Sequence, residues 1–471
     1  MSTKDFSYDD LDQSFRDKVA TIDNEGKRVW VYPQKPKGRF HQYRIVVASV
    51  CLMLLFGMPF IRLHGEPFML FNILERKFIL FGILFGPQDF FLLGLSMITF
   101  MVFIILFTVI YGRLFCGWVC PQTIFMEMVF RKIEYFIEGD ANKQRALAKA
   151  PMNAQKIFKK SAKHLIFFAI SFLIANTFLA YIISTDELFK IITDPVEEHI
   201  GGLTSMILFT GVFYWVFAFF REQVCTVVCP YGRLQGVLLD KNSIVVAYDY
   251  MRGEKRGKYR KGEDRTIGDC IDCHQCVAVC PTGIDIRNGT QLECVNCTAC
   301  IDACDDIMDR VGMPRGLITY ASEKGIAERK PLKFTLRIAA YSTVLLVLVG
   351  ILSFALISRN DTETTILRTP GMMYQENADG TISNLYNYKV NNKTFKDIDV
   401  YFKVEEIPAT IKIIGKSNIN VLKETSSQGT MFIYINPKNL EKRSTKIKIG
   451  VYKNNGELLE TVKTSFLSIA Q

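Results

Sequence analysis

Five long runs of apolar residues constrain the fold of this chain more than any other feature of its sequence. A helix that crosses a bilayer needs about 20 apolar residues, with a range of about 17–25. The runs approach or reach that length, and charged residues flank them, which disfavours core helices of a water-soluble protein. The sequence therefore predicts five membrane-spanning helices, at residues 45–61, 90–111, 165–184, 203–220 and 338–357.

The Lys and Arg residues between these runs indicate sidedness, because the cytoplasmic loops of membrane proteins collect them. Their number alternates along the chain: nine in residues 1–44, three in 62–89, ten in 112–164, one in 185–202 and seventeen in 221–333. This alternation predicts a cytoplasmic N-terminus and an extracytoplasmic C-terminus. The net charge of +10 is then explained by Lys and Arg in loops that face membrane lipid. The sequence contains no basic recognition motif that would point to a nucleic acid as partner.

Twelve of the thirteen cysteines fall into four tight groups, which indicates metal or redox sites rather than a disulfide framework. Two groups fit the pattern C-x2-C-x2-C-x3-C of bacterial ferredoxins with two [4Fe–4S] clusters. A pair of zinc ribbons is the alternative, but zinc ribbons separate their C-x2-C pairs by longer spacers. Pro281 follows the first group, and Asp305 stands at the equivalent place after the second.

The last cysteine of each ferredoxin group is expected to ligate the cluster of the other group. Such crossing holds the two clusters close enough for fast electron transfer between them. The predicted ligands are Cys270, Cys273, Cys276 and Cys304 for one cluster, and Cys294, Cys297, Cys300 and Cys280 for the other.

The two remaining groups share the motif C-x-x-x-C-P, and each follows an Arg at the end of a predicted helix. Cysteines four positions apart share one face of a helix, so the two pairs are expected to converge into a four-thiol site. Soft thiolates favour Cu(I), zinc or an iron–sulfur group, and the residues leave the metal open. Four buried cysteines that act as small hydrophobic residues are the alternative. The candidate copper or redox relay site consists of Cys116, Cys120, Cys225 and Cys229.

The chain changes character after residue 358, where short segments alternate apolar and polar residues between turn residues. This pattern predicts an immunoglobulin-like β-sandwich. A short apolar run at residues 78–85 is too short to span a bilayer and is interpreted as an interfacial or re-entrant segment. His41 and His164 flank predicted helices and are interpreted as interfacial residues, with haem ligation as the less favoured alternative.

These features predict a multi-domain membrane protein with five parts. They are a cytoplasmic arm (1–44), a four-helix membrane domain (45–235), a cytoplasmic ferredoxin-like domain with two [4Fe–4S] clusters (236–333), a fifth helix (334–358) and an outer β-sandwich (359–471).

The order of these parts and several stretches of sequence resemble a known family. The chain is similar to the CcoG/FixG/RdxA accessory proteins of cbb-type cytochrome c oxidase, and its membrane half also resembles quinol dehydrogenases of the NapH type. The stretches that carry the resemblance are Gly86–Asp89, Cys116–Gln122, Cys225–Gly232, Cys280–Arg287 through Asp305, and Gly380–Tyr386.

The resemblance implies a multi-pass protein of the bacterial inner membrane that acts as a cupric reductase, turning Cu(II) into Cu(I) for oxidase assembly. The expected partners are cbb-type oxidase subunits or copper chaperones, an unidentified electron donor, and a second copy of the chain in a homodimer. A quinol dehydrogenase that relays electrons, and a non-enzymatic assembly scaffold, are the alternatives. The full set of eight predicted cluster ligands favours a redox role over a scaffold.

Overall fold

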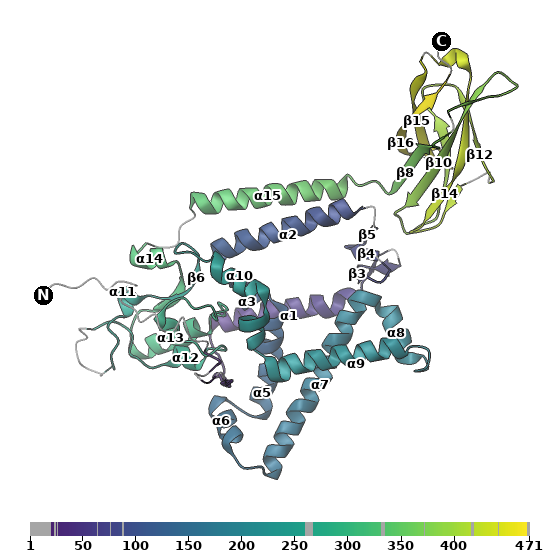
Figure 1. Cartoon of the computed structure of the whole chain (residues 1–471). Coiled ribbons are helices and arrows are strands. Elements are labelled where there is room, and N and C mark those ends of the chain that lie inside the picture. Colours follow the sequence, from purple (N-terminus) through teal and green to yellow (C-terminus); the bar gives the residue numbers. More distant parts are fainter. Residues whose placement is uncertain are drawn as a thin grey trace. The chain divides into compact units, whose positions relative to one another are not determined.

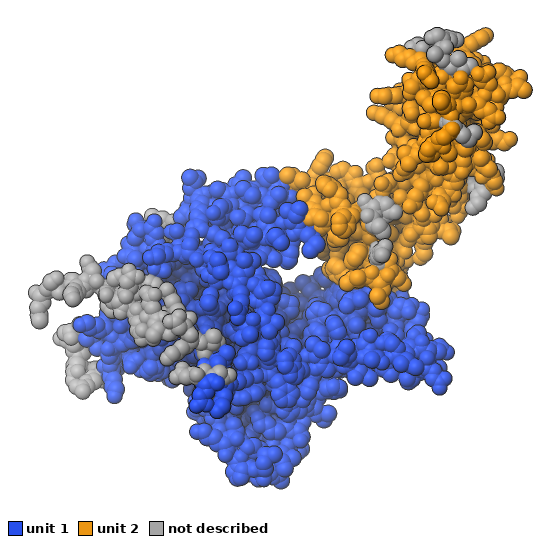
Figure 2. All heavy atoms as spheres, viewed as in Figure 1, with its two compact units in different colours: residues 1–60, 97–349 blue, residues 61–96, 350–471 orange. Residues whose placement is uncertain are grey.

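The computed structural model describes residues 20–468, apart from residues 23, 24, 26, 64, 76, 87, 88, 260–266, 331–334, 372, 416–418 and 441. The chain forms two compact units, which Figure 2 shows in different colours. The first unit comprises Met1–Phe60 and Met97–Val349, and the second comprises Ile61–Ser96 and Gly350–Gln471. The predicted five-part division differs from these units, chiefly because residues 61–96 belong with the C-terminal domain.

Five helices among the described residues are long and apolar enough to cross a membrane, which confirms the predicted number. Four of them start before their apolar runs; for example, the side chain of Asn153 accepts the amide hydrogen of Lys156 and caps the third helix. The apolar pattern therefore marks only the part of a helix that suits lipid. The helices are α1 (Arg39–Gly57), α2 (Phe90–Tyr111), α7 (Ala154–Ile183), α9 (Ile200–Trp215) and α15 (Leu336–Ile357).

The helices of the first unit pack on a core of aromatic rings, in which α7 runs along α9 (Figure 1). The rings of Phe130 and Phe217 stack at 4.5 Å, and Phe167 meets Phe130 edge-on. Short helices connect the long ones: η3 (Met58–Phe60), α3 (Leu114–Trp118), α4 (Pro121–Thr123), η5 (Ile124–Phe130), α5 (Arg131–Ile137), α6 (Ala141–Lys149), α8 (Thr185–Thr193), η6 (Val216–Phe220), η7 (Val224–Val228) and α10 (Pro230–Leu238).

The ferredoxin-like part of the first unit surrounds a two-stranded antiparallel sheet of β6 (Val245–Tyr248) and β7 (Ile318–Ala321). Residues of this sheet and of the surrounding helices share one core, which includes Val246, Met308 and Ile318. The helices are α11 (Tyr250–Gly253), α12 (Gln275–Ala278), η8 (Ile286–Asn288), α13 (Ala299–Val311) and α14 (Glu323–Ala327).

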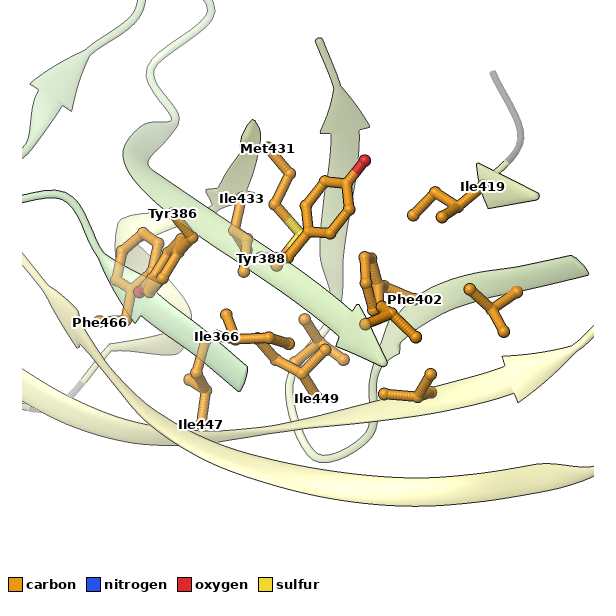
Figure 3. Close-up of a cluster of buried hydrophobic side chains, with 14 of the residues drawn as sticks. Ile366, Tyr386, Tyr388, Phe402, Ile419, Met431, Ile433, Ile447, Ile449 and Phe466 are labelled. Carbon is orange, nitrogen blue, oxygen red and sulfur yellow. The ribbon is translucent and has the colours of Figure 1, made fainter. Parts of the chain in front are cut away.

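The second unit contains the predicted β-sandwich, built from two antiparallel sheets. One sheet has the order β12-β14-β10-β8, with β9 paired to β10, and the other has the order β13-β11-β15-β16. Figure 3 shows Tyr386, Tyr388, Phe402, Met431 and Phe466 gathered between the sheets, where all five are buried. The strands are β8 (Thr362–Arg368), β9 (Gln375–Glu376), β10 (Ile382–Asn392), β11 (Ile398–Val404), β12 (Ala409–Ile413), β13 (Ile419–Val421), β14 (Ser426–Ile435), β15 (Ser444–Lys453) and β16 (Leu458–Leu467), and η9 (Pro437–Asn439) precedes β15.

The short apolar run at residues 78–85 forms strands rather than a re-entrant segment, and its interpretation as an interfacial segment stays a prediction. The run is apolar because its residues Ile79 and Leu84 are buried, together with Leu70 of the preceding strand, in a small cluster against Phe395 of the C-terminal domain. The strands before α2 form two small sheets: β1 (Arg62–Leu63) with β2 (Glu66–Pro67), and β3 (Met69–Asn72) with β4 (Lys77–Leu80) and β5 (Ile83–Phe85).

A buried carboxylate joins this segment to the β-sandwich within the second unit. Asp89 forms ion pairs with Arg359 and Lys393, both at 2.7 Å. Burial by itself raises the pKa of Asp89, but the hydrogen bonds from Lys393 and Arg359 outweigh burial and lower it. The ionised carboxylate therefore stabilises the fold above the unfolded pKa of about 3.9, and this stabilisation is lost as the pH falls through the lower, folded pKa.

We expect Asp89→Asn to lower the free energy of unfolding by about 2 kcal/mol at neutral pH, because charge-assisted hydrogen bonds to two cations are lost. In Asp89→Asn, the free energy of unfolding should also fall less on acidification than it does in the parent protein. Thermal unfolding at neutral and acidic pH measures both effects, with Asp361→Asn as control because Asp361 is exposed. Equal stability of Asp89→Asn and the parent protein at neutral pH would contradict the assigned role.

Candidate redox centre

The two ferredoxin loops have the same backbone conformation around their middle cysteines. The residues on either side of Cys273 are left-handed, with φ of 54° at Asp272 and 55° at His274. Asn296 and Thr298 flank Cys297 in the same way, with φ of 54° and 65°. Non-glycine residues rarely adopt this conformation, and its repetition makes each loop curl so that its three cysteines face inward. The helices α12 and α13 begin directly after these loops.

The thiol of the last cysteine in each group lies among the first three thiols of the other group. Burial, followed by the nearby thiols of Cys276, Cys273 and Cys270, raises the pKa of Cys304 to about 12. Cys280 is in turn a close electrostatic neighbour of Cys294, Cys297 and Cys300. The helices α12 and α13 therefore bring the eight thiols into two sets of four. The assignment of these residues as cluster ligands stays a prediction.

The set around Cys280 has the surroundings that an iron–sulfur cluster requires. A cavity lies between Cys276, Cys280, Cys294, Cys297 and Cys300. Backbone amides point at the sulfur atoms: those of Thr282, Ile284 and Gly283 at Cys280, that of Asn296 at Cys294, and that of Ala299 at Cys297. Because such hydrogen bonds tune cluster potentials, the residues present fit a [4Fe–4S] cluster.

The C-x-x-x-C-P motifs differ from the expected geometry. Cys116 lies in α3 and Cys225 in η7, but Cys120 and Cys229 are the residues before α4 and α10, with ψ of 123° and 111°. The prediction that each pair lies on one face of a continuous helix is therefore wrong. The physical reason is the proline that follows, because a proline forces the preceding residue out of the helical conformation and starts a new helix.

The four cysteines nevertheless lie close together. Burial, and then the nearby thiols of Cys120, Cys116 and Cys229, raises the pKa of Cys225 to about 12. Burial likewise raises the pKa of Cys116 to about 11, with Cys120 and Cys229 again among its neighbours. Thiols that lie this close together are hard to ionise unless a cation is present. The thiols of a metal site behave in the same way.

Arg113 connects the four-thiol site to the second ferredoxin loop. Its guanidinium group is 3% exposed, donates to Oε1 of Gln235 at 2.8 Å and to the carbonyl of Gly232 at 3.1 Å, and reaches the carbonyls of Leu292 and Cys294. Sequence reasoning noted the Arg before each motif but assigned no role to it. Arg113 is a cation near both sets of thiols, since it opposes the rise in pKa of Cys116, Cys225 and Cys294.

The four-thiol site is in direct contact with the second ferredoxin loop. A Cβ atom at Gly117 would lie 2.5 Å from the carbonyl oxygen of Asn296 and 2.6 Å from that of Val295. Cys116 shares a buried apolar cluster with Val295 and Cys297. The two motifs therefore pack with backbone against backbone, a contact that only glycine allows at position 117.

Hydrogen bonds reinforce this contact. The indole of Trp118 donates to the hydroxyl of Tyr320 at 3.0 Å, and that hydroxyl donates to the carbonyl of Asn296 at 3.4 Å. The guanidinium of Arg44, at the start of α1, donates to the carbonyl of Gly117 at 3.0 Å. These residues hold the loop of Cys294–Cys297 and the four-thiol site in one rigid arrangement.

Comparisons with known proteins agree with this architecture. A family model of a 4Fe-4S dicluster domain matches residues 220–323, one of a 4Fe-4S binding domain matches residues 93–138, and one of the immunoglobulin-like fold at the C-terminus of FixG matches residues 352–468. A solved FixG-related protein from Vibrio parahaemolyticus aligns with 23% of this chain and 98% of its own length, at 20% identity and a TM-score of 0.20.

Two relatives match most of the chain. The nitrogen fixation protein FixG of Rhizobium meliloti is 32% identical over 434 residues, which cover 83% of this chain and 82% of FixG. Protein RdxA of Cereibacter sphaeroides is 34% identical over 425 residues, which cover 87% of this chain and 89% of RdxA. Because the likeness extends over nearly the whole length and includes the iron–sulfur domains, the chain belongs to the FixG/RdxA family of iron–sulfur electron-transfer proteins.

Proposed function

We propose that this protein is a cupric reductase, in which the four-thiol site receives copper and electrons come from the two [4Fe–4S] clusters. The observation that carries the proposal is the direct contact of Gly117 and Cys116 with the loop of Cys294–Cys297. A metal ion held by the four thiols would lie next to a predicted cluster. Among the described residues, the only further cysteine outside the ferredoxin groups is Cys51.

The chain's own residues suit this reaction. Cys270, Cys273, Cys276 and Cys304 would hold one cluster, and Cys294, Cys297, Cys300 and Cys280 the other. The clusters, when bound, supply single electrons. Cys116, Cys120, Cys225 and Cys229 offer soft thiolates, which prefer Cu(I) to Cu(II) and so make reduction of the copper substrate more favourable. Arg113 offsets the negative charge of the thiolates and holds the two sites at a fixed separation.

An iron–sulfur relay without copper is the second candidate. The family model of a 4Fe-4S binding domain covers residues 93–138, which include Cys116 and Cys120. A third iron–sulfur group at the four-thiol site would pass electrons to another partner. Iron analysis separates the candidates, because two [4Fe–4S] clusters account for about eight iron atoms per chain and a third group would add to that number.

The setting of the reaction is also a proposal. The family resemblance supports a bacterial inner membrane, and the distribution of Lys and Arg supports both redox sites on its cytoplasmic side. The resemblance to oxidase accessory proteins supports delivery of Cu(I) to a cbb-type oxidase, and the β-sandwich would then meet an oxidase subunit outside. A periplasmic reporter enzyme fused to the C-terminus tests the sidedness, and an inactive reporter on a stably produced fusion would reverse it.

The decisive experiment follows the oxidation of chemically reduced clusters by Cu(II) in protein purified without oxygen. In a variant with Cys116, Cys120, Cys225 and Cys229 all changed to Ser, we expect the rate to fall at least about tenfold, which is 1.4 kcal/mol of barrier, while both clusters stay loaded. Cys51→Ser is the matched control, because Cys51 lies in α1 and its substitution removes one thiol outside the four-thiol site. Equal rates in all three proteins would refute copper reduction at this site.

A further inference from the structure

An open cavity of about 560 Å³ lies in the first unit where α1 begins. The first turns of α1 line one side, and η5 and α5 line the other. The polar lining includes His41, Arg44, Glu127, Arg131 and Tyr135, and the apolar lining includes Ile45, Met128 and Phe136. Because the candidate membrane span of α1 starts at Arg39, the cavity stands at the edge of the predicted bilayer, within reach of lipid-soluble molecules.

Two polar groups of this cavity lack hydrogen-bond partners among the residues that the structure describes. Nδ1 of His41 is shielded from solvent and has none. The guanidinium of Arg131 is 1% exposed and lies 3.1 Å from Glu127 and 3.9 Å from Glu222, yet its nitrogen atoms complete no hydrogen bond within those residues. Leaving such groups unpaired is costly, so a ligand that offers one hydroxyl group and a second oxygen as acceptor would satisfy them.

The cavity also adjoins both predicted clusters. The carboxylate of Asp302, between Cys300 and Cys304 on α13, accepts the amide hydrogens of Phe40 and His41 at 3.1 and 2.8 Å. Figure 1 shows α1 beside α13. Arg44 of α1 and Glu127 of η5, one from each side of the cavity, are electrostatic neighbours of Cys297. A redox-active ligand here would exchange electrons with the clusters over a short path.

We propose that this cavity binds the headgroup of a membrane quinol and that the quinol is the electron donor. The inference rests on the proposed function, since it names the reductant of the same clusters. The hydroquinone would donate a hydrogen bond to Nδ1 of His41 and accept one from Arg131. On oxidation the hydroquinone would lose two electrons to the two [4Fe–4S] clusters, when these are bound, and two protons to water at the cavity mouth, and it would leave as quinone.

An anionic lipid headgroup is the competing occupant, because Lys35 and Lys132 stand near each other at the same cavity. A phosphate would meet these two lysines, but it would leave the apolar side chains of Ile45, Met128 and Phe136 without a partner. The ring of a hydroquinone can pack against these side chains while its hydroxyl groups meet His41 and Arg131, which favours the quinol.

The test uses the full-length protein in lipid nanodiscs and heptyl-hydroxyquinoline N-oxide, a fluorescent quinol analogue whose emission is quenched in a binding site. We expect saturable quenching, about tenfold weaker binding in His41→Leu, and a similar loss in Ile45→Trp, whose indole fills the cavity. His164→Leu is the matched control, because His164 bonds to Tyr214 away from the cavity. A short-chain hydroquinone should reduce the clusters in the parent protein and control but not in the two cavity variants.

The outcomes separate this inference from the proposed function. Absence of quenching, or equal binding by all variants, overturns the quinol site even if chemically reduced clusters still react with Cu(II). Quenching that is displaced by anionic lipid but not by the short-chain hydroquinone also overturns it and assigns the cavity to a lipid headgroup. Binding and reduction by hydroquinone without reaction with Cu(II) would support the quinol site and refute copper reduction.

Discussion

Replacing Arg113 by Met is expected to destabilise the first unit by about 3 kcal/mol, the largest effect on stability that we predict for a single residue outside the cysteines. The substitution removes a buried cation and leaves the carbonyls of Gly232 and Leu292 without their donor. Buried carbonyls that lose a partner cost about 1–3 kcal/mol each. Thermal unfolding of the purified protein measures the loss.

The same substitution should also change the redox properties. Arg113 is the positive charge that opposes the raised pKa values of Cys116, Cys225 and Cys294. Without Arg113, the reduced form of the neighbouring cluster, which carries one more negative charge, is less stable. The midpoint potential of that cluster should therefore fall, by about 60 mV for each tenfold change in the equilibrium constant of its one-electron reduction. A redox titration followed by electron paramagnetic resonance measures this shift.

Arg233→Met provides the control for both effects, because Arg233 lies on the same helix, α10, as Gln235 but is exposed. Surface substitutions of this kind usually change stability by less than about 0.5 kcal/mol. If Arg113→Met and Arg233→Met unfold at the same temperature and keep the same cluster potentials, Arg113 does not connect the two sites.

Replacing Gly117 by Ala is expected to have the second large effect, on electron transfer from the clusters to the four-thiol site. The added Cβ would lie 2.5 Å from the carbonyl oxygen of Asn296, and both partners are backbone atoms, so neither can rotate away. Overpacking of this kind costs about 1–3 kcal/mol. The loop of Cys294–Cys297 should therefore move away from α3, with loss of iron from the second cluster or slower oxidation by Cu(II).

We expect the rate of oxidation by Cu(II) to fall at least about tenfold in Gly117→Ala, since displacements near 1 Å already have large effects on reacting centres. Gly211→Ala is the matched control: Gly211 is in α9, and a Cβ there meets nothing within 4 Å. Iron analysis and stopped-flow oxidation are measured on both proteins. An unchanged rate with a full iron content in Gly117→Ala would show that the contact plays no part in the transfer.

Features that depend on short stretches of sequence could be predicted without a structure. The apolar runs predicted the five long helices, because the length of a span follows from bilayer thickness. The period-two alternation of the segments after residue 358 predicted the β-sandwich, because alternate side chains of a strand face the core, as in β11. The cysteine spacing likewise identified two iron–sulfur motifs, since neighbouring cysteines of one loop must surround one cluster.

Contacts between distant segments could not be predicted in this way. The run at residues 78–85 forms strands because its partner Phe395 comes from the C-terminal domain, and a local pattern cannot reveal a partner so far along the chain. The role of Arg113 was hidden for the same reason, because its acceptors lie in α10 and in the second ferredoxin loop. Even the helix breaks at Cys120 and Cys229 were missed, although the prolines that cause them were visible.

The sequence by itself thus determined the kinds of structure and the chemistry of the ligands, because both follow from local periodicity, spacing and side-chain type. The tertiary structure alone decided that four cysteines from two motifs meet, that Gly117 presses them against the loop of Cys294–Cys297, and that a polar cavity opens beside α13. Those arrangements depend on which buried surfaces of distant segments fit each other, and close packing across the whole unit sets that fit.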